Sequence, residues 1–559
     1  MSDRKMIVLN HGKKIEIKIK KENKHTNLLQ LLQDNDIYIS NSCHGNGTCG
    51  KCKVRVKNGS LAVTENERKI LSKEALEKGI RLACKVKIED VLEREEHTQL
   101  IVEVLESQEE NIVVESVELK GTSKKNTSYF VAIDIGTTTI AMALVDGCTG
   151  EVCDTYVSVN HQRAFGADVV SRIASANAGM GEQLKQTIEE DLWNGIVYFL
   201  KKWNDINSND SMLLEEKQEV FLSGIIIAGN TTMMHLLRGY SCVSLGKHPF
   251  SSECLEQVEG KLKDFIGDGA KKGFSWVNEV PAFLMSGISA FVGSDIVAGM
   301  LVCPGFENEK ICYFLDLGTN GEMVMGNKDS MLATSVAAGP AFEGGNITCG
   351  TACIPGSICR VKISNGKPII GTIDKKMPPV GMCGSGLISV IAQLLNEKLM
   401  DFQGNLLHPF QKEGFSLWTF SSGEKITLYQ EDIRQFQMAK SAIRSGIEIL
   451  RQEYGCQLDD IDKVYVAGGF GTNLVEEDII LSELLPREWK GKIEFLGNTS
   501  LLGSIKFGMM QYGNKEKEDS CLEVKQRFIL DNIKTISLAN NEEFQRVYIE
   551  NLNFTALKN

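Results

Sequence analysis

The sequence predicts a small α+β domain followed by a large, internally duplicated α/β region. The N-terminal part combines strand and helix patterns around a loop that is rich in glycine and cysteine. From Tyr129 on, apolar runs that end in glycine loops alternate with helical segments, the pattern of layered α/β folds. Two of these runs, which begin at Phe130 and Tyr313, share a strand-Asp-aliphatic-Gly-Thr core. This repetition indicates that the large region is duplicated.

The N-terminal elements can be placed from their periodicity. Residues 5–20 alternate loosely between apolar and charged, as a pair of half-buried strands does. Thr26 stands where it can cap a short helix over 27–33. The expected elements that follow are a strand over 53–56 and a helical stretch near 66–78. We place this domain at 1–92 and a strand-bearing linker, rich in charge and valine, at 93–127.

The large region divides at the second repeat into subdomains that we place at 128–308 and 309–559. A long amphipathic helix with apolar residues from Ile433 to Leu450 precedes a third glycine-rich strand end. On this helix we interpret Lys440 as a solvated side chain. The alternating apolar residues of 528–557 predict a segment that completes a sheet.

Composition excludes several classes of protein. A formal net charge of -12 and no long basic run argue against a nucleic-acid binder. The longest apolar stretches fall far short of the ~20 residues of a membrane span, and the start lacks a signal peptide. We therefore expect a cytoplasmic protein with no nucleic-acid or membrane partner. In that compartment, its 16 cysteines point to metal or redox chemistry, or to small buried side chains.

Four cysteines form one motif: Cys43, Cys49 and Cys52 stand as C-x5-C-x2-C, and Cys84 follows at a distance. Four thiolates on a glycine-rich loop and a returning segment can ligate the two irons of a 2Fe-2S cluster. The glycines let backbone N–H groups approach the cluster sulfurs, which tunes the potential. The spacing is one residue longer than the plant-type C-x4-C-x2-C, so we interpret it as a variant of that motif.

A structural zinc site also accepts four cysteines and is the main alternative. Zinc ligands usually come as two Cys-x2-4-Cys pairs, whereas three of these cysteines share one loop, and this favours 2Fe-2S. His44 adjoins Cys43 and has the chemistry of a Rieske-type ligand, but four cysteines suffice and we interpret it as a loop residue. Cys349, Cys353 and Cys359 come nearest to a second cluster; we interpret them as structural.

Two motifs have the residues of phosphate-binding hairpins. In the first, Gly136 allows a tight turn, and Asp134 is a candidate to hold hydrated Mg²⁺. The hydroxyls and backbone N–H groups that can face phosphate oxygens belong to Thr137, Thr138 and Thr139. The second motif, over 316–322, repeats this pattern of residues. Asp316 and Glu322 are its candidates to contact Mg²⁺ or orient an attacking water. Its candidate nucleotide-binding residues are Gly318, Thr319 and Asn320.

A third motif supplies a surface for the nucleoside. A strand ends in Gly468, Gly469 and Phe470, and the two glycines would let a nucleoside lie close to the backbone. Each motif alone is also ordinary turn chemistry, but the three in this order favour an ATP site. Asn160 to Arg163 and Asn230 to Thr232 either contact nucleotide or partner, or act as caps.

In order and spacing, the three motifs resemble the phosphate 1, phosphate 2 and adenosine motifs of the superfamily of sugar kinases, heat-shock chaperone ATPases and actin. Together with the cysteine loop, the whole chain resembles the ATP-dependent reductive activators of corrinoid-dependent enzymes. The strings that carry this likeness begin at Cys43, Asn160, Ala228, Ala338, Gly381 and Ala467. The resemblance implies a β-grasp ferredoxin domain followed by a duplicated actin-like (ribonuclease H-like) ATPase domain.

The same resemblance implies a function. The ferredoxin domain would pass single electrons to a corrinoid protein whose cobalt has slipped to Co(II), and ATP would help to restore Co(I). An upstream low-potential electron donor and a homodimer are further expectations. Some members of the family carry an additional middle domain, whereas only about forty residues separate Cys84 from Tyr129, short of an ordinary domain. Docking features of such members are therefore not carried over.

Three other functions stay open. An activator of 2-hydroxyacyl-CoA dehydratases also joins an actin-like ATPase to iron-sulfur chemistry, but it lacks a separate ferredoxin domain. A kinase of a small metabolite needs no iron. A nucleotide-switched redox interaction protein would have no corrinoid-dependent ATP turnover.

Overall fold

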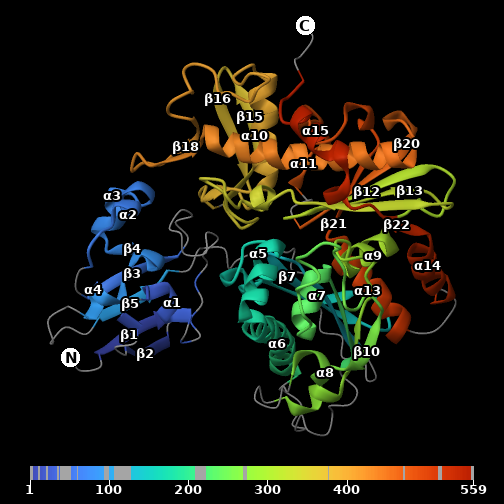
Figure 1. Ribbon diagram of the computed structural model, residues 1–559, viewed down its shortest axis with the longest axis horizontal. Coiled ribbons are helices and arrows are strands. Elements are labelled where there is room, and N and C mark those ends of the chain that lie inside the picture. Colours follow the sequence, from blue (N-terminus) through green and yellow to red (C-terminus); the bar gives the residue numbers. More distant parts are fainter. Residues whose placement is uncertain are drawn as a thin grey trace. The chain divides into compact units, whose positions relative to one another are not determined.

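The fold is described from a computed structural model of the protein (Figure 1). The structure describes residues 4–10, 13–19, 23–24, 26–33, 35, 37, 39, 52–58, 61–92, 100–105, 128–207, 222–267, 274–375, 377–469, 473–513 and 519–555. The chain forms two compact units, one from 1–110 with 161–187 and the other from 111–160 with 188–559. Among the described helices, none is both long and apolar enough to cross a membrane.

The first unit contains a five-stranded sheet, blue in Figure 1, with the strand order β2-β1-β5-β3-β4. Its strands are β1 (Arg4–Asn10), β2 (Lys13–Ile19), β3 (Lys53–Asn58), β4 (Ile80–Leu82) and β5 (Leu100–Val104). β1 and β5 pair in parallel and the other neighbours pair antiparallel. β5 lies at the centre of the sheet, so the domain extends past its expected end at residue 92. The placement of this strand in a linker was wrong.

Short helices complete this domain: α1 (Leu28–Gln33), α2 (Glu65–Ile70), α3 (Lys73–Glu77) and α4 (Ile88–Leu92). Asn27, and not Thr26, caps α1, because its side-chain oxygen accepts the N–H of Gln30 at 2.9 Å. The helical stretch near 66–78 is two helices, since Leu71 ends the first and Ser72 caps the second. Buried leucines of α1 pack with Val54 and Val102 in one apolar core.

Two six-stranded sheets form the frame of the second unit. The first has the order β10-β11-β9-β6-β7-β8, with β6 (Tyr129–Ile135), β7 (Thr139–Asp146), β8 (Val152–Val159), β9 (Leu222–Gly229), β10 (Val258–Lys261) and β11 (Pro281–Leu284). The second has the order β21-β20-β12-β13-β14-β22, with β12 (Ile311–Leu317), β13 (Gly321–Gly326), β14 (Met331–Val336), β20 (Ile461–Ala467), β21 (Ile493–Gly497) and β22 (Ile533–Thr535).

The two sheets share one pattern of pairing. In each, an antiparallel meander of three strands is followed by two strands parallel to its first member: β9 and β11 continue from β6, and β20 and β21 continue from β12. The predicted duplication and the actin-like fold class are thus confirmed.

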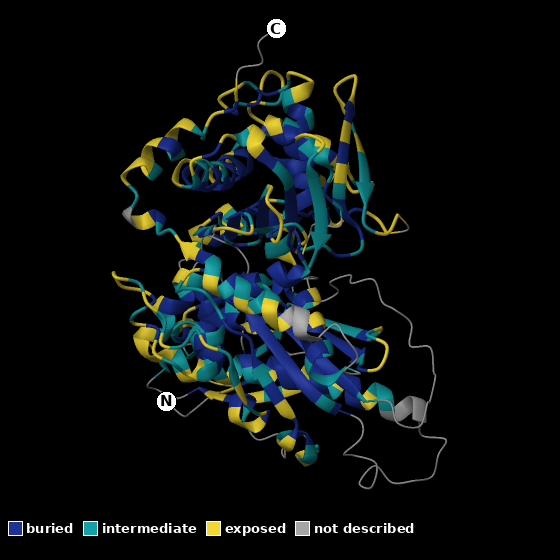
Figure 2. Ribbon diagram, turned by 90° about the vertical axis from the view of Figure 1, so that its right-hand side faces the viewer, coloured by how far each residue is buried: buried dark blue, intermediate teal, exposed yellow. Residues whose placement is uncertain are grey.

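Helices cover these sheets, which is why the central strands are buried on both faces and dark blue in Figure 2. In the first half, α13 (Thr499–Tyr512) packs on α9 (Ser294–Val302), β6 and β9. In the second half, α11 (Gln430–Tyr454) packs on β13, β14 and α15 (Glu542–Glu550). The other helices of eight or more residues include α6 (Gly181–Asn207), α7 (Thr231–Arg238), α10 (Gly384–Asn396) and α14 (Asp519–Asn532). The shorter ones include α5 (Val169–Ser175), α8 (Lys263–Ile266) and α12 (Glu476–Leu481).

Two smaller sheets lie in the second half. They consist of β15 (Ser357–Ser364), β16 (Lys367–Thr372) and β17 (Gly381–Met382), and of β18 (Phe415–Thr419) with β19 (Lys425–Leu428). Over its described residues, the C-terminal stretch adds β22 alone to a sheet, next to β14, and is otherwise largely helical. The expectation of a sheet segment over 528–557 was correct for three residues.

Lys440 was misinterpreted as solvated. Its side chain on α11 is buried, donates to the Asn553 carbonyl at 2.8 Å and lies over the Phe554 ring. Burial lowers the pKa of this ammonium group to about 8. Lys440 therefore fastens the C-terminal segment to α11 and does not line the cavity described below.

Candidate functional site

The first candidate site begins with a buried glutamate that fixes the chain near two cysteines. Thr64 and Glu67 form a capping box at the start of α2. The other carboxylate oxygen of Glu67 accepts the N–H of Leu82 at 2.9 Å. The N–H of Ala83 in turn donates to the carbonyl of Cys52 at 2.8 Å. These bonds hold the segment of Cys84 beside the start of β3.

As a result, the sulfurs of Cys52 and Cys84 lie 3.3 Å apart, and both are buried. This distance is longer than the roughly 2.05 Å of a disulfide, so the two sulfurs are not bonded to each other and share one site. A pair of adjacent thiols buried in an apolar core fits one side of a cysteine-ligated cluster. Cys43 and Cys49, the other two predicted ligands, lie outside the described residues.

The second candidate site is built on two turns at the ends of central strands. Between β6 and β7 the N–H of Gly136 donates to the Thr139 carbonyl at 3.0 Å. Between β12 and β13 the N–H of Gly318 donates to the Asn320 carbonyl at 2.8 Å. Asn160 holds the first turn, because its side-chain amide donates to the Gly136 carbonyl at 2.9 Å. This residue therefore acts by positioning the hairpin.

The two turns face one open cavity. All the predicted nucleotide-site residues that the structure describes line it: Asp134, Gly136, Thr137, Thr138, Thr139, Asp316, Gly318, Thr319, Asn320, Glu322, Gly468 and Gly469. Phe470 lies outside the described residues. Asn230 also lines the cavity; it caps α7 and donates to the Thr137 hydroxyl at 3.0 Å.

The carboxylate of Asp134 is held by two hydrogen bonds from one distant segment. Ser500 donates to it at 2.7 Å and the side-chain amide of Asn498 at 2.9 Å. Burial raises the pKa of Asp134, and these two bonds oppose that shift. The carboxylate is thereby oriented by groups that carry no charge.

Three more carboxyl groups lie around it, of which Glu322 is buried and Asp295 and Asp316 are half-buried. Burial, followed by the charge of Asp134, raises the pKa of Asp295 to about 7. Burial, followed by Asp295 and Asp134, raises the pKa of Asp316 to about 8. Burial, followed by the charges of Asp295 and Asp316, raises the pKa of Glu322 well above its ordinary value. These shifts indicate a site with surplus negative charge, as expected where a cation binds.

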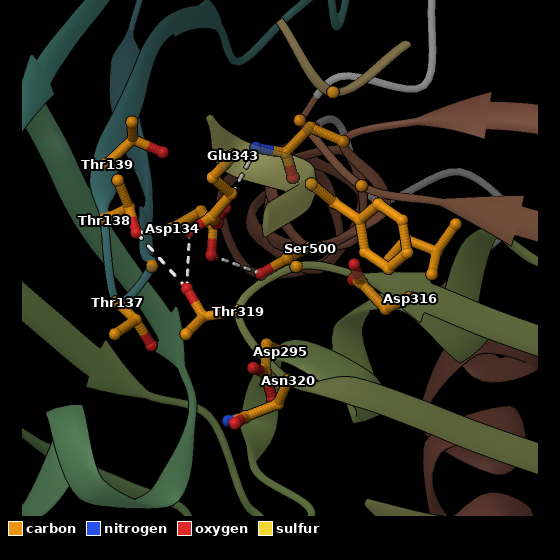
Figure 3. A pocket seen from close by; sticks show the side chains of 18 of the residues that line it. Asp134, Thr137, Thr138, Thr139, Asp295, Asp316, Thr319, Asn320, Glu343 and Ser500 are labelled. Atoms are coloured by element: carbon orange, nitrogen blue, oxygen red, sulfur yellow. Dashed lines mark hydrogen bonds between the residues drawn. The ribbon is translucent and has the colours of Figure 1, made fainter. Parts of the chain in front are cut away.

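Glu343 connects the two turns. One of its carboxylate oxygens accepts the hydroxyls of both Thr138 and Thr319, each at 2.5 Å, and those hydroxyl oxygens are 3.3 Å apart (Figure 3). Thr138 belongs to the first half and Thr319 to the second. A ligand that engages these hydroxyls would have to replace the contacts with Glu343.

The third motif closes another side of the cavity. Gly468 has φ +129°, and a Cβ there would lie 2.3 Å from the Leu317 carbonyl oxygen. Only glycine allows β20 to end this close to the second turn. Gly469 has open space where a Cβ would lie, as a flat surface for a ligand requires.

Sequence reasoning missed several cavity residues. Glu343 and Gly384 fall in strings that carried the family resemblance, whereas Asp295, Asn498 and Ser500 fall outside them, and no role was given to any of these five residues. The sequence feature that could have identified them is a polar residue at the start of a helix or next to a glycine. Within the described residues, no three His, Cys, Asp or Glu side chains are arranged to hold a metal ion by themselves.

Three family models match the chain in succession. A 2Fe-2S iron-sulfur cluster binding domain matches residues 10–89, the RACo middle region matches 129–307, and the C-terminal domain of RACo, the ASKHA domain, matches 310–559. The middle region thus coincides with the first half of the duplicated unit.

Individual relatives agree with these matches. Corrinoid activation enzyme RamQ of Eubacterium limosum is 30% identical over 453 residues, 77% of this chain and 71% of that protein. A [Co(II) methylated amine-specific corrinoid protein] reductase of Methanosarcina barkeri is 23% identical over 76% of this chain and 77% of its own. A solved reductive activator for corrinoid, iron-sulfur protein matches with a TM-score of 0.66 and 26% identity, covering 99% of this chain and 98% of its own.

The order of the three matched domains and the similarity to these relatives over most of their length lead to one assignment. The chain belongs to the RACo-type family of reductive activators of corrinoid proteins.

Proposed function

We propose that this protein reduces the cobalt of a corrinoid protein from Co(II) to Co(I), with one electron from a 2Fe-2S cluster and with ATP bound in the cavity of the second unit. The observation that carries the proposal is the combination in one chain of paired buried thiols in a ferredoxin-type domain and a cavity lined by acids and hydroxyls. Membership of the corrinoid-activator family places this reading ahead of a metabolite kinase or a dehydratase activator.

In the first unit, Cys52 and Cys84 would hold the cluster together with Cys43 and Cys49. The cluster, when bound, supplies a site that takes up and passes on single electrons at low potential. The hydrogen bonds made by Glu67 and by the N–H of Ala83 hold the chain segments of the two buried cysteines next to each other. No described cysteine is in a disulfide, which suits a reducing cytoplasm.

In the second unit, we assign the hydroxyls and N–H groups of the two turns to the phosphates of ATP. Asp134 and Asp316 would face Mg²⁺, largely through water and phosphate oxygens, because Mg²⁺ keeps much of its hydration shell. A divalent cation would offset the mutual repulsion that, after burial, raises the pKa values of Asp295 and Asp316. We assign Glu322 to orienting an attacking water and Gly468 with Gly469 to the nucleoside.

The energetics explain why ATP would be needed. Each 100 mV by which the cobalt couple lies below the donor costs about 2.3 kcal/mol per electron. A plant-type cluster near about -400 mV is therefore a weak donor to a lower couple. Nucleotide binding can favour electron transfer if it changes how the protein holds its partner. The corrinoid protein, an upstream low-potential donor and a second copy of this chain are the proposed partners.

The test is anaerobic. The purified protein is reduced, mixed with a corrinoid protein in the Co(II) state, and followed by visible absorbance with and without ATP and Mg²⁺. We expect Co(I) to form only with ATP and to be lost in Cys52→Ser and Asp316→Asn variants. Cys148→Ser, which alters an exposed cysteine, is the control. Formation of Co(I) at the same rate without nucleotide would contradict the role of ATP, and none with any corrinoid protein would favour the dehydratase-activator or switch functions.

A further inference from the structure

Glu343 is a carboxylate of the cavity wall to which the proposed reaction assigns no step. It ends a short 3-10 helix, Pro340–Glu343, and is half-buried. One of its oxygens, Oε2, accepts the hydroxyls of Thr138 and Thr319 (Figure 3). The other, Oε1, has no hydrogen-bond partner among the described residues and would lie 3.7 Å from a Cβ at Gly318. One oxygen is therefore held by both turns, and the other is free for a ligand of the cavity.

The chain that carries Glu343 is itself fixed. Gly339 begins this segment with φ +78°, a conformation that glycine adopts without strain. Its N–H donates to the Thr319 carbonyl at 2.9 Å, which ties the segment to the second turn. The ring of Phe342 is buried and meets Phe436 of α11 edge to face, with centroids 6.0 Å apart. The position of the carboxylate is thus set by backbone and core contacts.

The other four acids of the cavity form one cluster. After burial, the charges of Asp295 and Asp134 raise the pKa of Asp316, and Glu343 contributes least to this shift. Glu322 faces Asp316 across the second hairpin. The proposed function uses this cluster for the cation and for orienting a water. Glu343 differs from these acids because it is held by hydroxyls of both turns.

We propose that Glu343 is the general base of ATP hydrolysis and takes a proton from the water that attacks the terminal phosphate. This inference rests on the proposed function, because it needs the phosphates of ATP at the two turns. A water bound to Oε1 would lie beside a phosphate that the N–H groups of these turns hold. In this arrangement the hydroxyls of Thr138 and Thr319 stay on Glu343, and the phosphates take the backbone N–H groups.

The step balances in atoms and charge. The water oxygen forms a bond to the terminal phosphorus, and the bond from that phosphorus to the bridging oxygen breaks, with its electron pair leaving on ADP. One proton of the water passes to Oε1 of Glu343, and the other stays on the released phosphate. Glu343 then gives its proton to solvent and is a carboxylate again. No electron donor or acceptor is needed, so this step is separate from the chemistry of the cluster.

The opposite arrangement is that a phosphate displaces Glu343 from the two turns. Each of the hydroxyls of Thr138 and Thr319 has one proton, so it cannot donate to Glu343 and to a phosphate at once. In that case the carboxylate would compete with ATP and take no part in hydrolysis. The two arrangements therefore predict opposite effects when the carboxylate is replaced.

The experiment uses the full-length protein with its cluster, in the presence of Mg²⁺. Glu343→Gln keeps an oxygen that can accept the two hydroxyls but cannot take up the proton. Glu343→Ala leaves room for formate, a small carboxylate that can stand in for the missing side chain. Glu413→Gln, at an exposed glutamate outside the cavity, is the matched control. Calorimetry measures ATP affinity, and release of labelled terminal phosphate, with protein in excess over ATP, measures a single turnover.

We expect Glu343→Gln to slow the single turnover by about 10²-fold, within the range of general-base catalysis, and to leave ATP affinity unchanged. Formate should accelerate Glu343→Ala but not Asp316→Asn, and Glu413→Gln should behave as wild type. This combination supports the proposal.

Three results would overturn it. Wild-type turnover in Glu343→Gln removes the base, and tighter ATP binding in that variant would show that a phosphate displaces the carboxylate. A loss in Glu343→Ala that formate does not restore would mean a structural role. Wild-type protein that binds ATP without hydrolysing it also overturns the base but leaves the ATP site intact. Wild-type protein that binds no ATP refutes the proposed function itself.

Discussion

The two phosphate turns share one repeated sequence pattern, but the surroundings of their aspartates, Asp134 and Asp316, differ. The first turn spans 136–139, between the paired Ile135 and Ile140, and the second spans only 318–320, between Leu317 and Gly321. Asp134 faces Ala141 across its hairpin, whereas Asp316 faces Glu322. Neighbours directly across a hairpin interact strongly, and like charges there repel.

The partners of the two aspartates differ as well. Asp134 accepts hydrogen bonds from Asn498 and Ser500, while the side chain of Asp316 has no hydrogen-bond partner among the described residues. The repeated motif therefore produces the same turn but two electrostatic environments. Asp134 is oriented in advance, and Asp316 remains available for a ligand. This difference predicts how each half responds to substitution.

The largest effect is expected from Asp316→Asn. If this carboxylate serves the nucleotide chemistry, ATP-dependent Co(I) formation should fall by about 10²- to 10⁴-fold. Because the raised pKa of Asp316 leaves this carboxyl group largely protonated at neutral pH in nucleotide-free protein, the neutral amide should melt no lower than the wild-type protein. Thermal melting and stopped-flow absorbance check the two halves of this expectation. A variant with full activity would remove Asp316 from the reaction.

Ser500→Ala should give a smaller loss. It removes one of the two hydrogen bonds that orient Asp134, an interaction worth about 1.5–3 kcal/mol when the acceptor is charged. We expect roughly tenfold weaker ATP binding, measured by titration calorimetry. Ser504→Ala on the same helix is the control, since that hydroxyl donates to the Ser500 carbonyl within α13. Equal losses in both variants would mean a general effect of the helix.

Alanine at the two turn glycines tests the turns themselves. A Cβ at Gly136 would lie 2.7 Å from the Thr139 carbonyl oxygen, whereas at Gly318 the nearest atom is 3.6 Å away. Gly136→Ala should lower the free energy of unfolding by about 1–3 kcal/mol, and Gly318→Ala should change it little. Denaturant titration of both variants decides whether the first turn is the more constrained one.

The smallest effect is a dependence of stability on pH. Burial and neighbouring carboxylates raise the pKa of Asp295 to about 7 and of Asp316 to about 8, against an ordinary value of 3.8. Between these values the folded protein binds more protons than the unfolded chain, so stability falls as pH rises toward 8. Melting temperatures of nucleotide-free protein should therefore decline from about pH 5.5 to 8.5. Mg²⁺ or Asp316→Asn should make this decline shallower. If the melting temperature falls with pH as steeply under either condition as in nucleotide-free wild-type protein, the assignment of the decline to these carboxyl groups is contradicted.

The sequence by itself determined the fold class and the identity of most candidate residues, because these depend on local rules. A glycine after a buried strand makes a tight turn wherever it occurs, and alternating apolar residues make strands. The boundaries of strands, helices and domains were predicted less accurately. β5 was assigned to a linker, since nothing local shows that Leu100–Val104 pairs with β1 and β3.

Only the tertiary structure decided which charges meet. Asp295, Glu343 and Ser500 are far apart along the chain and become partners of the predicted motifs through the packing of α9, α10 and α13. Electrostatic interactions act over short distances in space regardless of separation in sequence, so the chemistry of this site could not be read from local patterns alone.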